Sequence, residues 1–175
     1  MKRKNHFLLL TFFLSPFVFA ILTGCKERIP HELPNIIWLT SEDNSPFLGC
    51  YGDTFATTPT LDKLASEGFL YTHAYANAPV CAPARNPIIT GIYACSGGNE
   101  NMRSYYSKSE TVKTYPEFLR EMGYYCTNNV KTDYNLGNFD EKSIWDECSD
   151  QAHYKNRAPG RPFFAIFNTT ISHES

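Results

Sequence analysis

Apolar residues along the chain form short runs that are separated by segments with helical spacing. Four runs rich in β-branched and aromatic residues predict strands, at 35–40, 69–76, 124–130 and 161–170. The first run is continuously apolar, which is typical of a strand buried on both faces of its sheet. Residues 59–68 and 116–123 place apolar side chains on one face and end in glycine, which predicts two short helices. Strands that alternate with helices predict an α/β domain with a mainly parallel sheet flanked by helices.

Polar residues that follow three of these strands are the first candidates for a functional site. Ligands in parallel sheets bind at the carboxyl ends of the strands, here directly after Leu39, Val130 and Thr170. Composition agrees with a folded domain, or the front part of a larger one, because 42% of the residues are hydrophobic and 19% are charged. With 16 basic and 18 acidic residues and no basic block beyond residues 1–4, the chain is not expected to bind nucleic acid.

The N-terminal segment has the pattern of a lipoprotein signal peptide, which we place at 1–24. A basic start precedes an uncharged apolar run at 7–23, as in secretory signals. The run is short for a transmembrane span and contains Pro16. The sequence Leu-Thr-Gly-Cys that ends at Cys25 resembles the bacterial lipobox. The resemblance implies a lipid on Cys25 that anchors the protein to a membrane of the bacterial cell envelope, on its periplasmic or surface side. The alternative is an uncleaved anchor helix.

Cleavage before Cys25 would leave a tether at 25–33 and a domain at 34–175. Lipidation of Cys25 would leave five of the six cysteines, an odd number in an oxidising compartment. One thiol is therefore expected to have a role other than bridging. The cysteines then available for disulfides are Cys50, Cys95, Cys126 and Cys148.

The segment 79–91 is the most informative part of the chain. It reads Pro-Val-Cys-Ala-Pro-Ala-Arg-Asn-Pro-Ile-Ile-Thr-Gly, with Cys81, Pro83 and Arg85 followed by Thr90 and Gly91. This pattern resembles the signature of the sulfatase family. Three further segments are similar to that family, at 34–36, 48–52 and 58–65. The resemblance implies an alkaline phosphatase-like sulfatase core, of which residues 34–175 are the N-terminal part.

In that family the motif cysteine, Cys81 in this chain, is converted by a maturation enzyme to Cα-formylglycine. One hydroxyl of the hydrated aldehyde attacks sulfur as the nucleophile, and the substrate alcohol leaves. The second hydroxyl then loses its proton, so that the aldehyde re-forms and sulfate is expelled. Arg85 follows one helical turn later if the motif opens a helix. Its guanidinium is expected to hold the hydrated aldehyde and to balance the carboxylates around it.

The resemblance also implies one divalent cation. Glu42 and Asp43 follow the first strand, where the family places metal ligands, usually as an Asp-Asp pair. Together with the matured Cys81 they are the expected metal ligands. Hard oxygen donors of this kind suit Ca²⁺, which would polarise the sulfate oxygens.

Three residues are implied in binding the substrate. Lys131 matches a family lysine that is expected to contact the sulfate oxygens, and Asp133 stands where a histidine is usual. Asp133 is expected to bind a substrate hydroxyl or to orient Lys131. His173 is the candidate general acid for the leaving group, because imidazole exchanges protons near neutral pH. Residues 98–103 are assigned only to the wall of the cleft.

The sequence therefore predicts a sulfatase that acts on a sulfated carbohydrate. A phosphonate or phosphate monoester hydrolase that uses the same aldehyde is one alternative. A non-catalytic, glycan-binding surface lipoprotein is another, favoured by Glu42, Asp133 and the expected truncation of the chain. Sulfatases usually run to several hundred residues and contain a later Asp-Asn pair and lysine. The chain is thus expected to be truncated, and it is not expected to be active alone.

Overall fold

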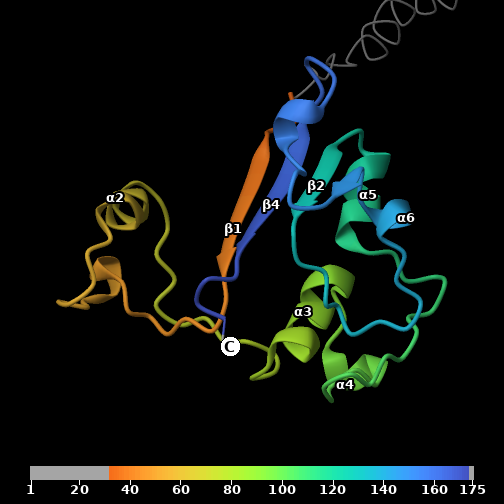
Figure 1. The fold of residues 1–175 in the computed structure, drawn as a ribbon, viewed down its shortest axis with the longest axis horizontal. Helices are drawn as coiled ribbons and strands as arrows, with labels where there is room; N and C mark the ends of the chain where they lie inside the picture. Colours follow the sequence, from red (N-terminus) through yellow and green to blue (C-terminus); the bar gives the residue numbers. More distant parts are fainter. Residues whose placement is uncertain (1–31, 174–175) are drawn as a thin grey trace, which may run out of the picture. The chain divides into compact units, whose positions relative to one another are not determined.

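The computed structural model describes residues 32–173, so the predicted signal peptide and Cys25 lie outside the described residues. Residues 34–175 form one compact unit. Its strands build one sheet in the order β1-β4-β2-β3, in which every neighbouring pair is parallel (Figure 1). The strands are β1 Ile36–Ser41, β2 Tyr125–Asn129, β3 Glu147–Cys148 and β4 Phe163–Thr169. The prediction of an α/β domain with a parallel sheet is confirmed.

Helices and short 3-10 turns connect the strands. They are η1 Gly49–Tyr51, α2 Pro59–Glu67, α3 Cys81–Thr90, α4 Ala94–Gly97, α5 Tyr115–Glu121, α6 Glu141–Ile144 and η2 Tyr154–Asn156. The two helices expected from the sequence are α2 and α5. Helix α5 begins at a capping box in which the Thr114 backbone N–H and hydroxyl donate to the Glu117 carboxylate at 2.6 and 2.7 Å.

The core occupies both faces of the sheet, because successive residues of a strand point to opposite sides. In β4, Phe164 packs with the cluster on one face and Phe163 with the cluster on the other. The first cluster includes Ile89 of α3 and Ile144 of α6, so these helices cover that face. The second cluster is smaller and includes Tyr154 of η2. The sheet is therefore closed more fully on the α3 face.

The expectation that the first strand is buried on both faces is wrong for the part of the chain that the structure describes. β1 pairs only with β4 there. Trp38 contacts Phe164, with ring centroids 5.1 Å apart, whereas Ile37 and Leu39 on the opposite face are 48% and 70% exposed. Among residues 32–173, β1 is therefore an edge strand with one covered face. A continuous apolar run does not reveal which faces of a strand have a partner.

The strand expected at 69–76 is also absent. This segment has no helix or strand, and Phe69 and Tyr75 are 94% and 87% exposed. Aromatic residues favour strands only where a neighbouring strand pairs with their backbone, and within 32–173 no strand lies beside this segment.

The cysteines in the described part of the chain are free thiols, so none of the disulfides considered above is present there. Cys126 is fully buried in the core, and burial raises the pKa of its thiol to about 12. Burial likewise raises the pKa of the Cys148 thiol. These two thiols pack as apolar groups.

Candidate active site

Helix α3 positions the cysteine and the arginine of the motif. Cys81 is its first residue, so the motif opens a helix, which was the condition for placing Arg85 one turn from Cys81. Arg85 lies one turn further along the same side. Buried Asn86 donates from Nδ2 to the Tyr134 carbonyl at 3.0 Å, which ties the helix to the chain beyond β2. The helix ends at Gly91, where a left-handed φ of 70° favours glycine.

The Arg85 guanidinium is held by three neutral oxygens at the carboxyl ends of two strands. Its Nε and Nη2 donate to the backbone carbonyls of Thr132 (3.0 Å) and Lys131 (2.6 Å), after β2. Its Nη1 donates to the Asn168 side chain of β4 at 3.4 Å. Because these acceptors carry no net charge, they fix the guanidinium without cancelling its positive charge. Arg85 is thus oriented to stabilise an anion near Cys81.

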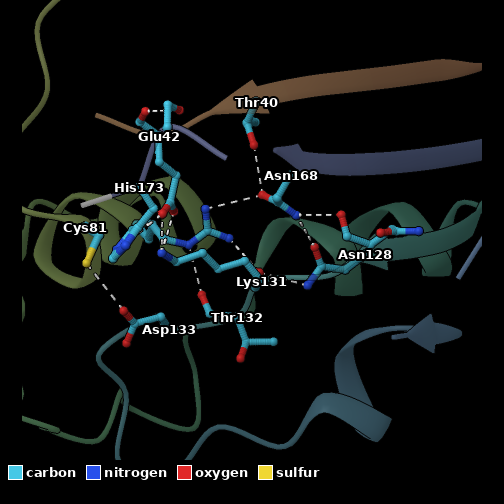
Figure 2. A network of polar contacts seen from close by, with 12 residues as sticks. Thr40, Glu42, Cys81, Asn128, Lys131, Thr132, Asp133, Asn168 and His173 are labelled. Carbon is cyan, nitrogen blue, oxygen red and sulfur yellow. Dashed lines mark hydrogen bonds and ion pairs between the residues drawn. The ribbon is translucent and has the colours of Figure 1, made fainter. Parts of the chain in front are cut away.

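A row of polar side chains, Thr40, Asn168 and Asn128, crosses three strands and was not predicted from the sequence (Figure 2). Asn168 accepts from the Thr40 hydroxyl of β1 at 2.9 Å and donates to the Asn128 side chain of β2 at 2.9 Å. Asn128 in turn donates to the Lys131 carbonyl at 3.0 Å. The available signal was the presence of asparagine inside two of the predicted strands, at 128–129 and at 168. Such a residue is buried only if its hydrogen bonds are satisfied.

Glu42 joins the two predicted substrate-binding cations. Its side chain is 8% exposed, and the Lys131 Nζ lies 2.5 Å from its carboxylate oxygens. His173 Nε2 lies 3.6 Å from the same carboxylate, an ion pair when the imidazole is protonated. Figure 2 shows Lys131 and His173 converging on Glu42 from different segments. A carboxylate this buried needs such partners.

Cys81 lies beside Asp133. The Cys81 thiol donates to Asp133 Oδ2 at 3.5 Å (Figure 2), and Asp133 Oδ1 forms an ion pair with Arg103. The hydrogen bond and charge of Asp133 raise the pKa of the Arg103 guanidinium. Arg103 comes from the segment that the sequence assigned only to the cleft wall, and no motif pointed to it.

The structure thus brings together the residues that the sequence selected from the motif at 79–91 and after the three strands. Cys81, Arg85, Lys131, Asp133, His173 and Glu42 are linked through direct contacts or a shared neighbour. Asp43 follows Glu42 with a left-handed φ of 54°. Within 32–173, no group of three His, Cys, Asp or Glu side chains is arranged to hold a metal ion. The adjacent carboxylates of Glu42 and Asp43 have the right chemistry for Ca²⁺ but supply only part of its shell of about 6–8 oxygens.

Comparison with known proteins shows the family to which the chain belongs. The family model named Sulfatase matches residues 34–175. The chain belongs to the sulfatase family. An ulvan-active sulfatase of Formosa agariphila is 39% identical over 190 residues, which cover 93% of this sulfatase chain and 31% of the relative. The iduronate 2-sulfatase of Mus musculus is 32% identical over 112 residues, or 63% of this chain and 20% of the relative. The chain therefore spans less than a third of either relative.

Solved sulfatase structures share the fold. One, in complex with D-glucosamine-2-N,6-O-disulfate, has a TM-score of 0.67 at 21% identity and covers 81% of this chain and 35% of the other. A 2-O GAG sulfatase has a TM-score of 0.63 at 18% identity, with 80% and 35% coverage. The expected sulfatase-like α/β core is thereby confirmed. Of the residues at 32–173, none belongs to a helix long and apolar enough to cross a membrane.

Proposed function

We propose that this protein hydrolyses sulfate esters of carbohydrates, with Cys81 as the precursor of a formylglycine nucleophile. One observation carries the proposal: Cys81 opens α3 within the family signature, and Arg85 and Lys131 lie in the same polar cluster. The N–H groups at the start of a helix favour an anion such as sulfate. The names of the relatives, an ulvan-active sulfatase and an N-acetylgalactosamine-6-O-sulfatase, support a sulfated polysaccharide as the substrate class.

Each side chain of the cluster would have a different role toward a bound sulfate ester. The Lys131 ammonium would exchange part of its contact with Glu42 for a sulfate oxygen, because a mobile point charge can shift between neighbouring anions. The Arg85 guanidinium, fixed by its three oxygens, would stabilise negative charge that develops near Cys81. Protonated His173 would give its proton to the leaving alcohol, and Asp133 would accept a hydrogen bond from a substrate hydroxyl.

Mass spectrometry of the peptide that contains Cys81 tests the proposal. Conversion of the thiol to the aldehyde is expected to lower the peptide mass by about 18 Da in protein isolated from its native host. An intact thiol in that material would instead support a glycan-binding protein without catalysis. We also propose that a maturation enzyme acts on Cys81. In a host that lacks the gene for this enzyme, the peptide that contains Cys81 is expected to keep the mass of the thiol form. Hydrolysis of phosphate esters but not sulfate esters by the native protein would support the phosphatase alternative.

We further propose that Glu42, Asp43 and the matured Cys81 contribute to a Ca²⁺ site. The cation would polarise the sulfate when bound. Chelation is expected to lower activity at least about 10-fold, with recovery on addition of Ca²⁺. Asp43→Asn is expected to lower the calcium content more than Glu42→Gln, because Asp43 is the residue usual at its position in the family and Glu42 is not. Elemental analysis measures the metal directly. Full activity and no bound metal after dialysis against chelator would contradict the site.

We propose that Cys25 carries a lipid that holds the protein in the bacterial cell envelope, with its domain on the periplasmic or surface side. The proposal rests on the lipobox-like sequence before Cys25. Cys25→Ser is expected to leave the precursor uncleaved or to release the protein into the soluble fraction. Immunoblots of fractionated cells measure both results. An unchanged size with unchanged membrane retention would support the uncleaved anchor helix.

A further inference from the structure

A third cation reaches the candidate active site from the loop that the sequence assigned only to the wall of the cleft. Arg103 lies between α4 and α5, and its Nη1 pairs with Asp133 Oδ1. The other oxygen of Asp133 accepts from the Cys81 thiol at 3.5 Å. A single carboxylate therefore separates the Arg103 guanidinium from the proposed nucleophile.

Two buried asparagines hold the loop in place. Asn135 is 2% exposed, and its Nδ2 reaches the carbonyls of Asn99 and Asn101 at 3.0 and 2.8 Å. Asn99 is equally buried, and its Oδ1 accepts from the Tyr106 N–H at 3.1 Å. These contacts pin both ends of the turn that carries Arg103. The turn is thus positioned before any ligand arrives.

The backbone on both sides of the ion pair is strained in the same way. Arg103 has a φ of 61° and Asp133 a φ of 38°. Their neighbours Tyr105 and Asn135 also have positive φ values, 53° and 55°. Non-glycine residues rarely adopt this left-handed region, and they remain there only where the surroundings enforce it. The hydrogen bonds of the buried asparagines supply that enforcement.

Lys131, Arg85 and Arg103 differ in how far their side chains are exposed, and this difference indicates different roles. The Lys131 side chain is 15% exposed and contacts Glu42, and Arg85 is fixed by carbonyls and Asn168. Both are directed inward, where the scissile sulfate would lie. The Arg103 side chain is 50% exposed. It presents a guanidinium to solvent beside the nucleophile, a position from which it can meet a substrate group other than the ester under attack.

We propose that Arg103, oriented by Asp133, binds a second anionic group on the substrate sugar, next to the sulfate ester that is cleaved. The inference rests on the proposed sulfatase function and names its substrate class, a sulfated sugar that also carries a carboxylate or another sulfate. A guanidinium binds either anion through two parallel hydrogen bonds. Arg103 is then a residue of substrate specificity, and Asp133 is its positioning residue.

The test compares Arg103→Gln with unchanged enzyme, both isolated from the native host in matured form. The substrates are 4-nitrophenyl sulfate, a sulfated uronic acid, the methyl ester of that uronic acid, and a disulfated hexosamine. For the substrate with the recognised second anion, the variant is expected to raise KM about 10–100-fold. KM for 4-nitrophenyl sulfate and for the methyl ester should not change. Discrimination between acid and ester identifies a carboxylate, and an effect on the disulfated sugar alone identifies a second sulfate.

Two controls sharpen the comparison. Lys113→Gln removes an exposed cation that pairs with Glu121 on α5 and should leave every KM unchanged. Arg103→Lys keeps the charge and should recover part of the lost affinity. Equal losses by Arg103→Gln on all four substrates, or no loss on any, would overturn the proposal.

Failure of the sulfatase function gives a different result, namely no turnover of any substrate by the unchanged enzyme. Calorimetric titration with the uronic acid sulfate and the disulfated hexosamine then decides the question. Binding that weakens about 10-fold or more in Arg103→Gln supports an anion site, and equal binding by both proteins refutes it.

Discussion

Replacement of Cys81 by alanine is expected to abolish sulfate release from the native, matured enzyme, with a fall of about 10⁴-fold or more in kcat. The change removes the proposed precursor of the nucleophile and very little else. Cys81 is the first residue of α3 and makes one long hydrogen bond, to Asp133 at 3.5 Å. The free energy of unfolding should therefore change by less than about 1 kcal/mol. Ion chromatography of released sulfate and thermal unfolding measure the two quantities.

Cys81→Ser serves as the companion variant. A serine hydroxyl can be matured only by machinery that oxidises serine, so its activity should depend on the host, whereas the alanine variant should be inactive in every host. Sulfate release by the alanine variant at the native rate would remove Cys81 from the mechanism.

Arg85→Lys is expected to reduce kcat/KM about 10²–10³-fold, the second largest effect. Lysine keeps the charge but cannot reach the carbonyls of Lys131 and Thr132 and the side chain of Asn168 at once. Stability should fall by about 1–2 kcal/mol, because polar groups in a half-buried site lose their donors. Steady-state kinetics and chemical denaturation measure the two losses.

Arg120→Lys is the matched control, since Arg120 lies on α5 and pairs with Asp146 at 3.4 Å. It should affect stability without changing kcat/KM. An Arg85→Lys variant that behaves in the same way would show that Arg85 supports the fold only.

The sequence correctly predicted those helices and strands that are marked by a local pattern of apolar residues. β2, β4, α2 and α5 appear within one or two residues of their expected ends. The strand expected at 69–76 was wrong, because the exposed aromatic residues there have no strand to pair with among residues 32–173. The two-residue strand β3 is too short to produce a periodic pattern, and its pairing with β2 at Thr127 and Asn128 is set entirely by the fold.

Some residues of the candidate site could likewise be predicted from the sequence, and others could not. Residues that directly follow strands could be selected, because the carboxyl ends of parallel strands meet at one edge of the sheet. Asn168 and Asn128 lie inside strands, and only the register of β1, β4 and β2 shows that they form a continuous polar row. Arg103 lies in a loop whose conformation depends on two asparagines, one of them 36 positions away from its bonding partner. Such contacts leave no local pattern in the sequence.

The strand order also determines when the domain can assemble during synthesis. β4 lies between β1 and β2 but is the last of the described strands to leave the ribosome. The hydrogen bond between Thr40 and Asn168 spans 128 positions, and contacts so distant in sequence form slowly because a long loop must close first. Until β4 emerges, β1 has no partner among the described strands, and its apolar residues stay exposed while residues 42–162 are synthesised. The order of synthesis therefore predicts that the nascent β1 is a binding site for chaperones until β4 is made.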